Sequence, residues 1–377
     1  MTAWNIITGH YPPQPGGVSD YTRLVAQGLA AAGDSVSVWT SPFDATLTSC
    51  NQVRVNRLPD HFGRRGLAIL DRALRREPES RVLLEYVPHA YGMKAMNVPL
   101  CVLLLRHRHR DITVMFHEVA YPIERRQPIA HNLLGVVNRA MAAILARAAS
   151  RIFVAAQAWK VEVARYAPAA SKIEWLPVPS TIRVSIDRAG TLEKRARFVA
   201  PGVTLLGHFG TYGRLITAQL KPGLVSILAA RNDVQVLLIG RQSESFLDDF
   251  LREHRSFAPR VFATGSLSET DVSESISACD IMIQPYPDGI TARNTSALAG
   301  LAHRKAVVTT TGRFTEDLWR RSGAVLLAPC NDAHSFARSV FELMDDRDRA
   351  NAMGCAAIKL YRDVFDLRHT IEALRAA

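Results

Sequence analysis

Short apolar runs alternate with amphipathic stretches along the whole chain. In the first half the apolar runs predict buried strands at residues 4–8, 36–40, 82–86, 113–116, 151–155 and 173–176. Apolar residues at helical spacing predict helices at 19–32, 133–149 and 158–166. A strand, a loop, a helix and a second strand follow one another between residues 4 and 40, and such a βαβ unit implies a parallel sheet.

The same alternation restarts after a charged stretch without periodicity, residues 181–202, which we take as a linker. Strands are predicted at 203–208, 234–239, 261–263, 281–284 and 306–309. Helices are predicted at 220–230, 246–254, 269–277, 295–303, 335–344, 347–362 and 367–376. The pattern therefore predicts an α/β protein with two Rossmann-like, doubly wound domains, residues 1–180 and 203–359.

Composition narrows the class of protein. The 377 residues are 48% hydrophobic and 21% charged, which is typical of globular domains and excludes a disordered, coiled-coil or collagen-like chain. The net charge of +11 suits anionic partners such as nucleotides or phospholipid surfaces, or reflects a generally basic surface. We interpret the basic run Arg106–Arg110 first as a solvated surface and second as a contact with anionic lipid. We expect no nucleic-acid binding.

The cysteines and the apolar runs bear on the cellular compartment. Cys50, Cys101, Cys279, Cys330 and Cys355 are scattered without metal-ligand spacing, which favours reduced thiols and no metal site. No signal peptide is recognisable, and the longest apolar run, residues 98–105, is too short to span a membrane. We expect a cytoplasmic protein, with peripheral contact at the inner membrane face as an alternative.

Chemistry in an open parallel sheet is expected just after the strands, at their carboxyl ends. Gly16 and Gly17 precede the first helix and let backbone N–H groups approach an anion, although a simple turn is the alternative. His117 and Glu118 follow a strand directly. A histidine there can bind a substrate oxygen or exchange a proton, or it can be a structural loop residue.

Glycines and cations follow the first strand of the second half. Gly210, Thr211, Arg214 and Lys221 form a plausible cradle for a diphosphate, and Arg241 follows the next strand. The alternative is a glycine-rich turn with solvated cations.

A third loop, residues 284–296, joins a strand to a helix. The backbone N–H groups near Asn294, Thr295 and Ser296 can bind a phosphate, and Asp288 can accept hydrogen bonds from sugar hydroxyls. The same residues are also common as helix caps and turn residues.

Taken in order, these motifs resemble those of the retaining glycosyltransferases of family 4, the glycogen-synthase-like group with the GT-B fold. The resemblance covers nearly the whole chain and rests on Gly16-Gly17, on residues 116–118, on residues 278–285 and on residues 297–310. It implies two domains facing across a cleft, with the last helix, about 360–377, crossing back to the N-terminal domain. The N-terminal domain would bind the acceptor and the C-terminal domain a nucleotide-sugar.

The resemblance also implies roles for individual residues. Gly17 would lie against the donor diphosphate, His117 beside the transferred sugar, and Arg214 and Lys221 on the diphosphate. The paired glutamates of the family, separated by seven residues, correspond to Asp288 and Ser296, so the second carboxylate is replaced by a hydroxyl.

The resemblance implies a retaining, metal-independent transfer of a sugar, with UDP or GDP as the nucleotide, to the hydroxyl of a sugar, glycolipid or other acceptor in glycan or polysaccharide biosynthesis. His117, Glu118 and Asp288 are the catalytic candidates, and no cofactor other than the donor is expected. Two alternatives remain: a non-catalytic nucleotide-sugar-binding or scaffold protein, which Ser296 motivates, and a nucleotide-sugar epimerase of the same fold.

Overall fold

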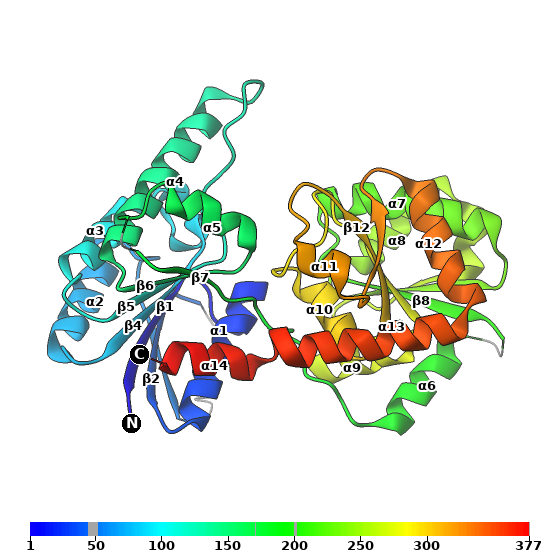
Figure 1. Ribbon diagram of the computed structural model, residues 1–377, viewed down its shortest axis with the longest axis horizontal. Helices are drawn as coiled ribbons and strands as arrows, with labels where there is room; N and C mark the ends of the chain where they lie inside the picture. The colour runs from blue at the N-terminus through cyan, green and yellow to red at the C-terminus, as the bar shows by residue number, and fades with distance from the viewer. Residues whose placement is uncertain (44–51, 170, 200–201, 377) are drawn as a thin grey trace. The chain divides into compact units, whose positions relative to one another are not determined.

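The computed structural model describes residues 1–43, 52–169, 171–199 and 202–376 (Figure 1). The chain forms two compact units. The first unit comprises Met1–Val178 and Leu367–Ala377, and the second comprises Pro179–Asp366. The C-terminal segment therefore returns to the first unit, as the resemblance implies, but at residue 367 rather than about 360.

The first unit is built on a sheet of seven parallel strands in the order β3-β2-β1-β4-β5-β6-β7. The strands are β1 (Ala3–Thr8), β2 (Ser35–Thr40), β3 (Val53–Arg57), β4 (Arg81–Tyr86), β5 (Ile112–Phe116), β6 (Arg151–Val154) and β7 (Ile173–Trp175). The central strands β1, β4 and β5 are buried almost throughout, because helices cover both faces of the sheet.

The helices of the first unit divide between the two faces of this sheet (Figure 1). Residues of α2, α3, α4 and α5 share one core with alternate residues of the strands. On the other face α1 packs against α14, and Gly28 of α1 leaves the space that Ile371 occupies. The helices are α1 (Gly17–Ala31), α2 (Arg64–Arg76), α3 (Val98–Arg106), α4 (Ile129–Ala148), α5 (Gln157–Ala164) and α14 (Leu367–Arg375), with short 3-10 turns at Pro88–Tyr91 and Met93–Ala95.

The second unit has a sheet of six parallel strands in the order β10-β9-β8-β11-β12-β13. The strands are β8 (Thr204–Phe209), β9 (Val234–Ile239), β10 (Val261–Ala263), β11 (Ile281–Gln284), β12 (Ala306–Thr311) and β13 (Leu326–Pro329). The chain reverses strand order between β8 and β11, which is the position where ligands bind in doubly wound sheets.

Helices cover both faces of this second sheet as well. The core joins α7, α8 and α12 to the sheet through side chains such as Leu224, Phe250 and Phe336. The helices are α6 (Arg188–Phe198), α7 (Arg214–Ala230), α8 (Ser243–Glu253), α9 (Glu269–Ala278), α10 (Thr295–Ala302), α11 (Asp317–Arg321), α12 (Ala333–Asp345) and α13 (Arg347–Leu360), with a 3-10 turn at Arg255–Arg260 and a π-helical turn at Tyr361–Phe365.

The predicted fold class, two Rossmann-like doubly wound domains, is confirmed by these two sheets. The pattern did not reveal β3, α2 or β13. The stretch expected as a linker, residues 181–202, contains α6, whose N-terminus is capped by Asp187 and which packs against α9. Lys194 of α6 is paired with Asp271 of α9 across 2.7 Å, so the charges of this stretch attach it to the second unit.

The basic run Arg106–Arg110 is not a continuous solvated or lipid-binding face. Arg110 is buried and donates to the backbone carbonyl groups of Leu74, Glu77 and Ser80. His107 is also buried and bonds Asp71 across 2.7 Å. Two of the five residues of the run therefore stabilise the first unit from inside.

Two further expectations concern cysteines and apolar helices. Cys101 and Cys279 are buried free thiols, Cys355 is exposed, and Cys50 lies outside the described residues. Within the described residues, one helix, α4, is long and apolar enough to cross a membrane by length and composition. Its apolarity is spread over many small residues, so it does not form the unbroken run that the sequence search looked for.

Candidate active site

A buried hydrogen bond between a histidine and a carboxylate joins the carboxyl ends of β4 and β5 in the first unit. Nε2 of His117 lies 2.7 Å from Oε2 of Glu85, and both side chains are buried. Because a carboxylate oxygen accepts, Nε2 is the donor in this contact. Within the described parts of the chain Nδ1 makes no hydrogen bond, so this atom is left for a ligand.

Two aromatic residues hold His117 in place, one at its ring and one at its backbone. The ring of Tyr21, from the first turns of α1, contacts it edge-on at a centroid distance of 4.9 Å. Nε1 of Trp159 donates to the backbone carbonyl group of His117 across 3.1 Å. Burial, and then the nearby charge of Glu85, raises the pKa of Tyr21 well above its usual value, so this phenol stays protonated.

Gly16 and Gly17 lie at the start of the helix that carries Tyr21. Gly16 is the N-cap of α1 and contributes no side-chain capping bond, while Gly17 is the first helical residue. Backbone N–H groups of the first turn of a helix attract anions. The Tyr21–His117 contact therefore brings the predicted glycine turn and the predicted histidine to the same end of the first sheet.

Glu118 lies beside a group of histidines on the neighbouring loops. Its Oε2 is 3.7 Å from Nδ1 of His89, and both side chains are exposed. Burial lowers the pKa of His10, and the nearby His89 and His61 lower it further. The loops after β1, β3 and β4 therefore come close to one another at this edge.

In the second unit, the loops after β8 and β9 contact each other through glycine. Gly240 has a φ of +112°, and a Cβ there would come within 2.6 Å of the carbonyl oxygen of Gly210. Arg214 is the first residue of α7, whose N-cap is Gly213, and Arg241 follows Gly240 directly; both arginines are exposed. Thr211 is exposed in the same loop. The structure thus brings Gly210, Thr211, Arg214 and Arg241 to one edge of the sheet.

Lys221 does not join this group. It lies two turns into α7, and its Nζ is 2.6 Å from Oε1 of Glu253 at the end of α8. A helix rises 1.5 Å per residue, so Lys221 is roughly 10 Å along the axis from Arg214. The sequence motif assigned the lysine to the diphosphate from its spacing to Arg214 alone. That spacing does not show where α7 begins.

Asp288 lies on the loop after β11 and is paired with an arginine that the sequence did not single out. Nε of Arg313 lies 2.8 Å from Oδ1 of Asp288, and both side chains are largely exposed. Gly312, after β12, permits close packing of the two loops, since a Cβ there would be 2.5 Å from the carbonyl oxygen of Asp288. The carboxylate is therefore oriented from the neighbouring loop.

The three polar residues at the start of α10 differ in what they can offer a ligand. The side chain of Asn294 accepts from the backbone N–H and the hydroxyl of Thr291, so it stabilises its own loop. Thr295 and Ser296 are half-buried in the first turn of α10, and Oγ of Ser296 lies 2.7 Å from the hydroxyl of Tyr286.

A buried glutamate fixes the loop that leads into this helix. Oε2 of Glu316 accepts from the backbone N–H of Ala292 and from Nε1 of Trp319. Glu316 therefore acts as a structural residue of the loop.

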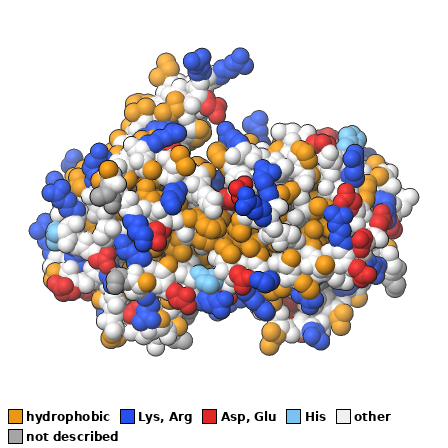
Figure 2. Space-filling model, viewed as in Figure 1, with side chains coloured by type: hydrophobic (Ala, Val, Ile, Leu, Met, Phe, Trp, Pro, Cys, Tyr) orange, Lys and Arg blue, Asp and Glu red, His pale blue; other side chains and the backbone are white. Residues whose placement is uncertain are grey.

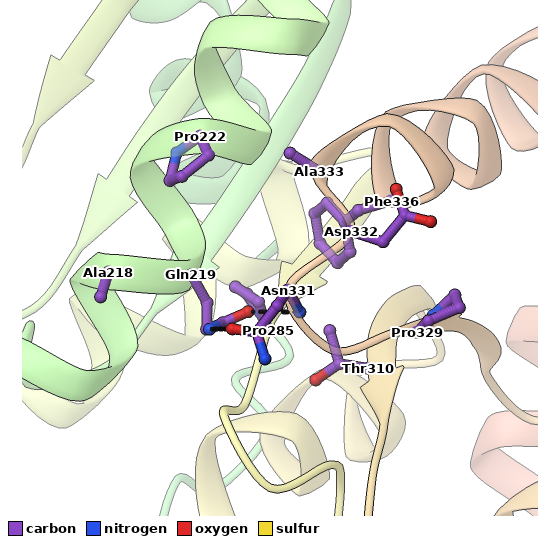
Figure 3. Close-up of a pocket in the computed structure, with 10 residues that line it drawn as sticks. All are labelled: Ala218, Gln219, Pro222, Pro285, Thr310, Pro329, Asn331, Asp332, Ala333 and Phe336. Carbon is purple, nitrogen blue, oxygen red and sulfur yellow. Dashed lines mark hydrogen bonds between the residues drawn. The ribbon is translucent and has the colours of Figure 1, made fainter.

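A small pocket lies next to this region but is not the predicted site (Figure 3). It measures about 140 Å³ and is lined mainly by prolines and by residues of α7 and α12, with Gln219 hydrogen-bonded to Asn331 at its edge. Pockets that bind small-molecule ligands typically measure about 300 Å³ or more, so this one is smaller by about a factor of two. None of the predicted site residues lines this pocket. In the described part of the chain, no cluster of three or more His, Cys, Asp or Glu side chains is arranged to hold a metal ion.

Sequence reasoning missed three residues of these sites: Glu85, Tyr21 and Arg313. Only Glu85 carried a signal, because it is an acidic residue in an otherwise apolar strand that the pattern predicts to be buried. Tyr21 lies among the apolar residues whose spacing predicts the first helix, and Arg313 stands in no motif. Their roles depend on contacts between segments far apart in the sequence.

Comparisons with known proteins agree with this architecture. Residues 217–346 match the family model described as "Glycosyl transferases group 1". Sucrose-phosphate synthase from Thermosynechococcus elongatus aligns with a TM-score of 0.74 at 15% identity, over 99% of this chain and 97% of that one. A search of curated proteins found no match.

Two other solved structures are similar over their whole length. WaaG, a glycosyltransferase involved in lipopolysaccharide biosynthesis, has a TM-score of 0.70 at 15% identity, over 99% of this chain and 100% of that one. Anabaena HepE, solved in complex with UDP and glucose, has a TM-score of 0.73 at 14% identity, over 99% and 98%. At such identities the likeness establishes the GT-B fold. Together with the family-model match over residues 217–346, it confirms the enzyme class predicted from the sequence: the chain is a glycosyltransferase of the GT-B fold.

Proposed function

We propose that the protein transfers a sugar from a nucleoside diphosphate sugar to an acceptor hydroxyl, with retention of the anomeric configuration. The observation that carries this proposal is the position of Arg214 and Arg241. They follow neighbouring parallel strands, at the carboxyl edge where doubly wound sheets bind ligands, and Arg214 begins a helix with no side-chain cap. Two guanidinium groups beside a helix N-terminus suit a diphosphate.

UDP is the nucleotide that we propose for the donor. Anabaena HepE, which has the same fold, was solved with UDP, with UDP and glucose, and with UDP-glucose. In this chain the hydroxyl of Ser296 would bind the ribose where the related family uses a carboxylate. The acceptor would be a sugar, a glycolipid or another hydroxyl compound of glycan or polysaccharide biosynthesis.

The proposed roles of the side chains follow from their chemistry. Nδ1 of His117 accepts a hydrogen bond from a hydroxyl of the transferred sugar, and Glu85 holds the ring in that orientation. Arg214 and Arg241 stabilise the negative charge that develops on the leaving diphosphate. The acceptor hydroxyl attacks C1 of the sugar from the side of the leaving group while the bond between C1 and the diphosphate breaks. The departing phosphate oxygen takes the proton of the hydroxyl, so the reaction needs no covalent intermediate with the protein. Glu118 and Asp288 bind hydroxyl groups of the substrates.

The experiment is a thermal-shift titration with UDP, GDP, ADP, dTDP and CMP. A ligand at one hundred times its dissociation constant stabilises a protein by about 2.7 kcal/mol, which gives a measurable rise in the melting temperature. We expect UDP to stabilise the protein and the double variant Arg214→Ala/Arg241→Ala to lose most of that effect. Lys221→Ala is the matched control and should respond to UDP like the wild type.

The titration also separates the two alternatives. If no nucleoside diphosphate raises the melting temperature, the proposed donor site is wrong. If UDP-sugar binds but is neither transferred nor hydrolysed, the protein is the non-catalytic binding protein that Ser296 in place of a glutamate suggests. An epimerase would convert UDP-sugar into its isomer without an acceptor, which NMR of the anomeric protons distinguishes from transfer.

A further inference from the structure

The N-terminal half of α4 carries an exposed apolar stripe. Ile129, Leu133 and Val136 are 87%, 58% and 55% exposed, and their spacing places them on one face of the helix. Figure 1 shows this half of α4 projecting from the first unit together with the loop that precedes it. Single exposed apolar residues are normal, but a continuous apolar stripe on a projection marks a binding surface.

Packing explains the apolar character of only the other half of this helix. Met141, Ala142 and Leu145 are buried in the core beside α3. In the whole apolar stretch of α4 only 33% of the residues are buried. Because its C-terminal half belongs to the core of a folded domain, α4 cannot cross a bilayer, and the exposed half needs a different explanation.

The loop before α4 extends the apolar surface and is firmly attached to the helix. Tyr121 and Ile123 are 38% and 47% exposed. Ile123 packs onto Gly135, where a Cβ would come within 2.7 Å of its Cγ1. Asn138 accepts from the backbone N–H of Tyr121, and Asn132 bonds both the N–H and the carbonyl group of Glu124. The projection, residues 121–136, is therefore a built structure.

Two cations lie at the tip of this projection. Arg125 and Arg126 are exposed, and within the described residues neither makes a hydrogen bond or an ion pair. Glu124 is the acidic neighbour in the same turn. Figure 2 shows Lys and Arg side chains at the end of the projection and hydrophobic side chains along it. Apolar side chains beside arginines are typical of segments that lie in a membrane interface.

We propose that residues 121–136 dock this protein onto an anionic phospholipid membrane, with the apolar stripe entering the interface and Arg125 and Arg126 contacting the headgroups. The charge of the tip and the net charge of +11 of the chain favour an anionic lipid surface. Self-association through the same face would bring the arginine excess of one copy against that of the other. The proposal does not depend on the donor site.

Vesicle flotation with the full chain tests the proposal. We expect the wild type to bind vesicles of phosphatidylglycerol and phosphatidylethanolamine and not vesicles of phosphatidylcholine. The triple variant Ile129→Ser/Leu133→Ser/Val136→Ser should bind at least tenfold more weakly. Arg125→Ser/Arg126→Ser should bind about tenfold more weakly at low salt, and this difference should shrink at high salt, where charges are screened.

Matched controls exist in the same chain. Ile186, Leu192 and Val184 are 96%, 66% and 49% exposed in the second unit, and their triple serine variant should bind like the wild type. Arg64→Ser/Arg65→Ser on α2 is the control for the arginine pair. All variants should keep the wild-type circular dichroism and melting temperature, because the substituted side chains are exposed.

Three results would overturn the proposal. The first is a wild type that does not float with anionic vesicles. The second is an equal loss of binding in the control triple variant. The third is a projection variant that binds vesicles normally but changes from dimer to monomer in sedimentation, which would assign the stripe to a second copy of the chain.

Discussion

Nε2 of His117 lies 2.7 Å from Oε2 of Glu85, and the carboxylate has no exposure to solvent. The other carboxylate oxygen, Oε1, is buried without a hydrogen-bond partner among the described residues. A buried charge of this kind is costly unless it is paired, so the histidine and the glutamate depend on each other. The pair connects the interior of the first sheet with the loop that carries Glu118.

The first prediction concerns Glu85→Gln. A hydrogen bond to a charged group contributes about 1.5–3 kcal/mol, so we expect kcat to fall by about ten- to a hundredfold with little change in KM for the donor. The pH profile of kcat should also change, since the partner of His117 no longer carries a charge. Steady-state kinetics across pH 5–9 measure both effects.

The matched control is Asp71→Asn, which disrupts a second histidine–carboxylate pair of the same length, Asp71 with His107. That pair lies away from the predicted site residues. Asp71→Asn should lower the melting temperature without altering kcat or its pH profile. Equal kinetic effects of the two substitutions would mean that Glu85 is only structural.

The second prediction separates the cations of the second unit. Removing both Arg214 and Arg241 should weaken UDP binding by at least a hundredfold, because each arginine makes a charge-assisted contact with the diphosphate. Lys221→Ala should leave the dissociation constant within about twofold, since Lys221 is paired with Glu253. Isothermal titration calorimetry measures all three constants, and a large effect of Lys221→Ala would restore the sequence-based assignment.

The third prediction concerns the hydroxyl that stands in place of a carboxylate. If Ser296 binds the ribose, Ser296→Ala should weaken UDP binding by about three- to tenfold, the value of one neutral hydrogen bond. Tyr286→Phe removes the partner of Ser296 and leaves its hydroxyl in place, so it should not weaken binding. Equal affinity of Ser296→Ala and wild type would exclude the ribose contact.

The fourth prediction concerns acid stability. Burial lowers the pKa of His208 to about 4, and Nδ1 of this ring donates to the carbonyl group of Ile283 across 2.8 Å. An unfolded histidine titrates near 6.5, so the unfolded state binds more protons between pH 6.5 and 4. The contribution of His208 to the free energy of unfolding is therefore fully present above pH 6.5 and decreases as the pH drops. At pH 5 the loss from this residue is about 2 kcal/mol.

Urea unfolding at pH 7 and pH 5 measures this loss. His208→Asn retains a donor for Ile283 and does not titrate, so the difference between the two pH values should be smaller by about 2 kcal/mol. Burial also lowers the pKa of His303 to about 4, and this residue should account for part of the remaining loss. An unchanged pH dependence in His208→Asn would contradict the assignment.

The fifth prediction concerns metal ions. If Arg214 and Arg241 stabilise the leaving diphosphate, transfer should proceed at the same rate with EDTA and with added Mg²⁺. Measuring UDP release in both conditions tests this. Loss of activity in EDTA that Mg²⁺ restores would assign the charge stabilisation to a metal ion.

The sequence by itself determined the two-sheet architecture. Strands buried on both faces must be apolar throughout, and the helices between them must be amphipathic, so the alternation is visible without any tertiary information. It also selected His117, Gly17, Arg214 and Asp288 as candidate site residues, because ligand-binding residues of such folds follow the strands. It failed for β3 and β13 at sheet edges, where short strands carry a weaker pattern.

Tertiary structure decided which of these residues have partners and where they lie. Glu85 and His117 are separated by 31 intervening positions, and only the pairing of β4 with β5 brings them together. Lys221 points to Glu253 because α7 begins at Arg214 and carries it away from the loop edge. Half of α4 is core and half is exposed, although both halves are apolar. Periodicity records which residues avoid water, whereas the surface that each one contacts depends on packing between segments remote in the chain.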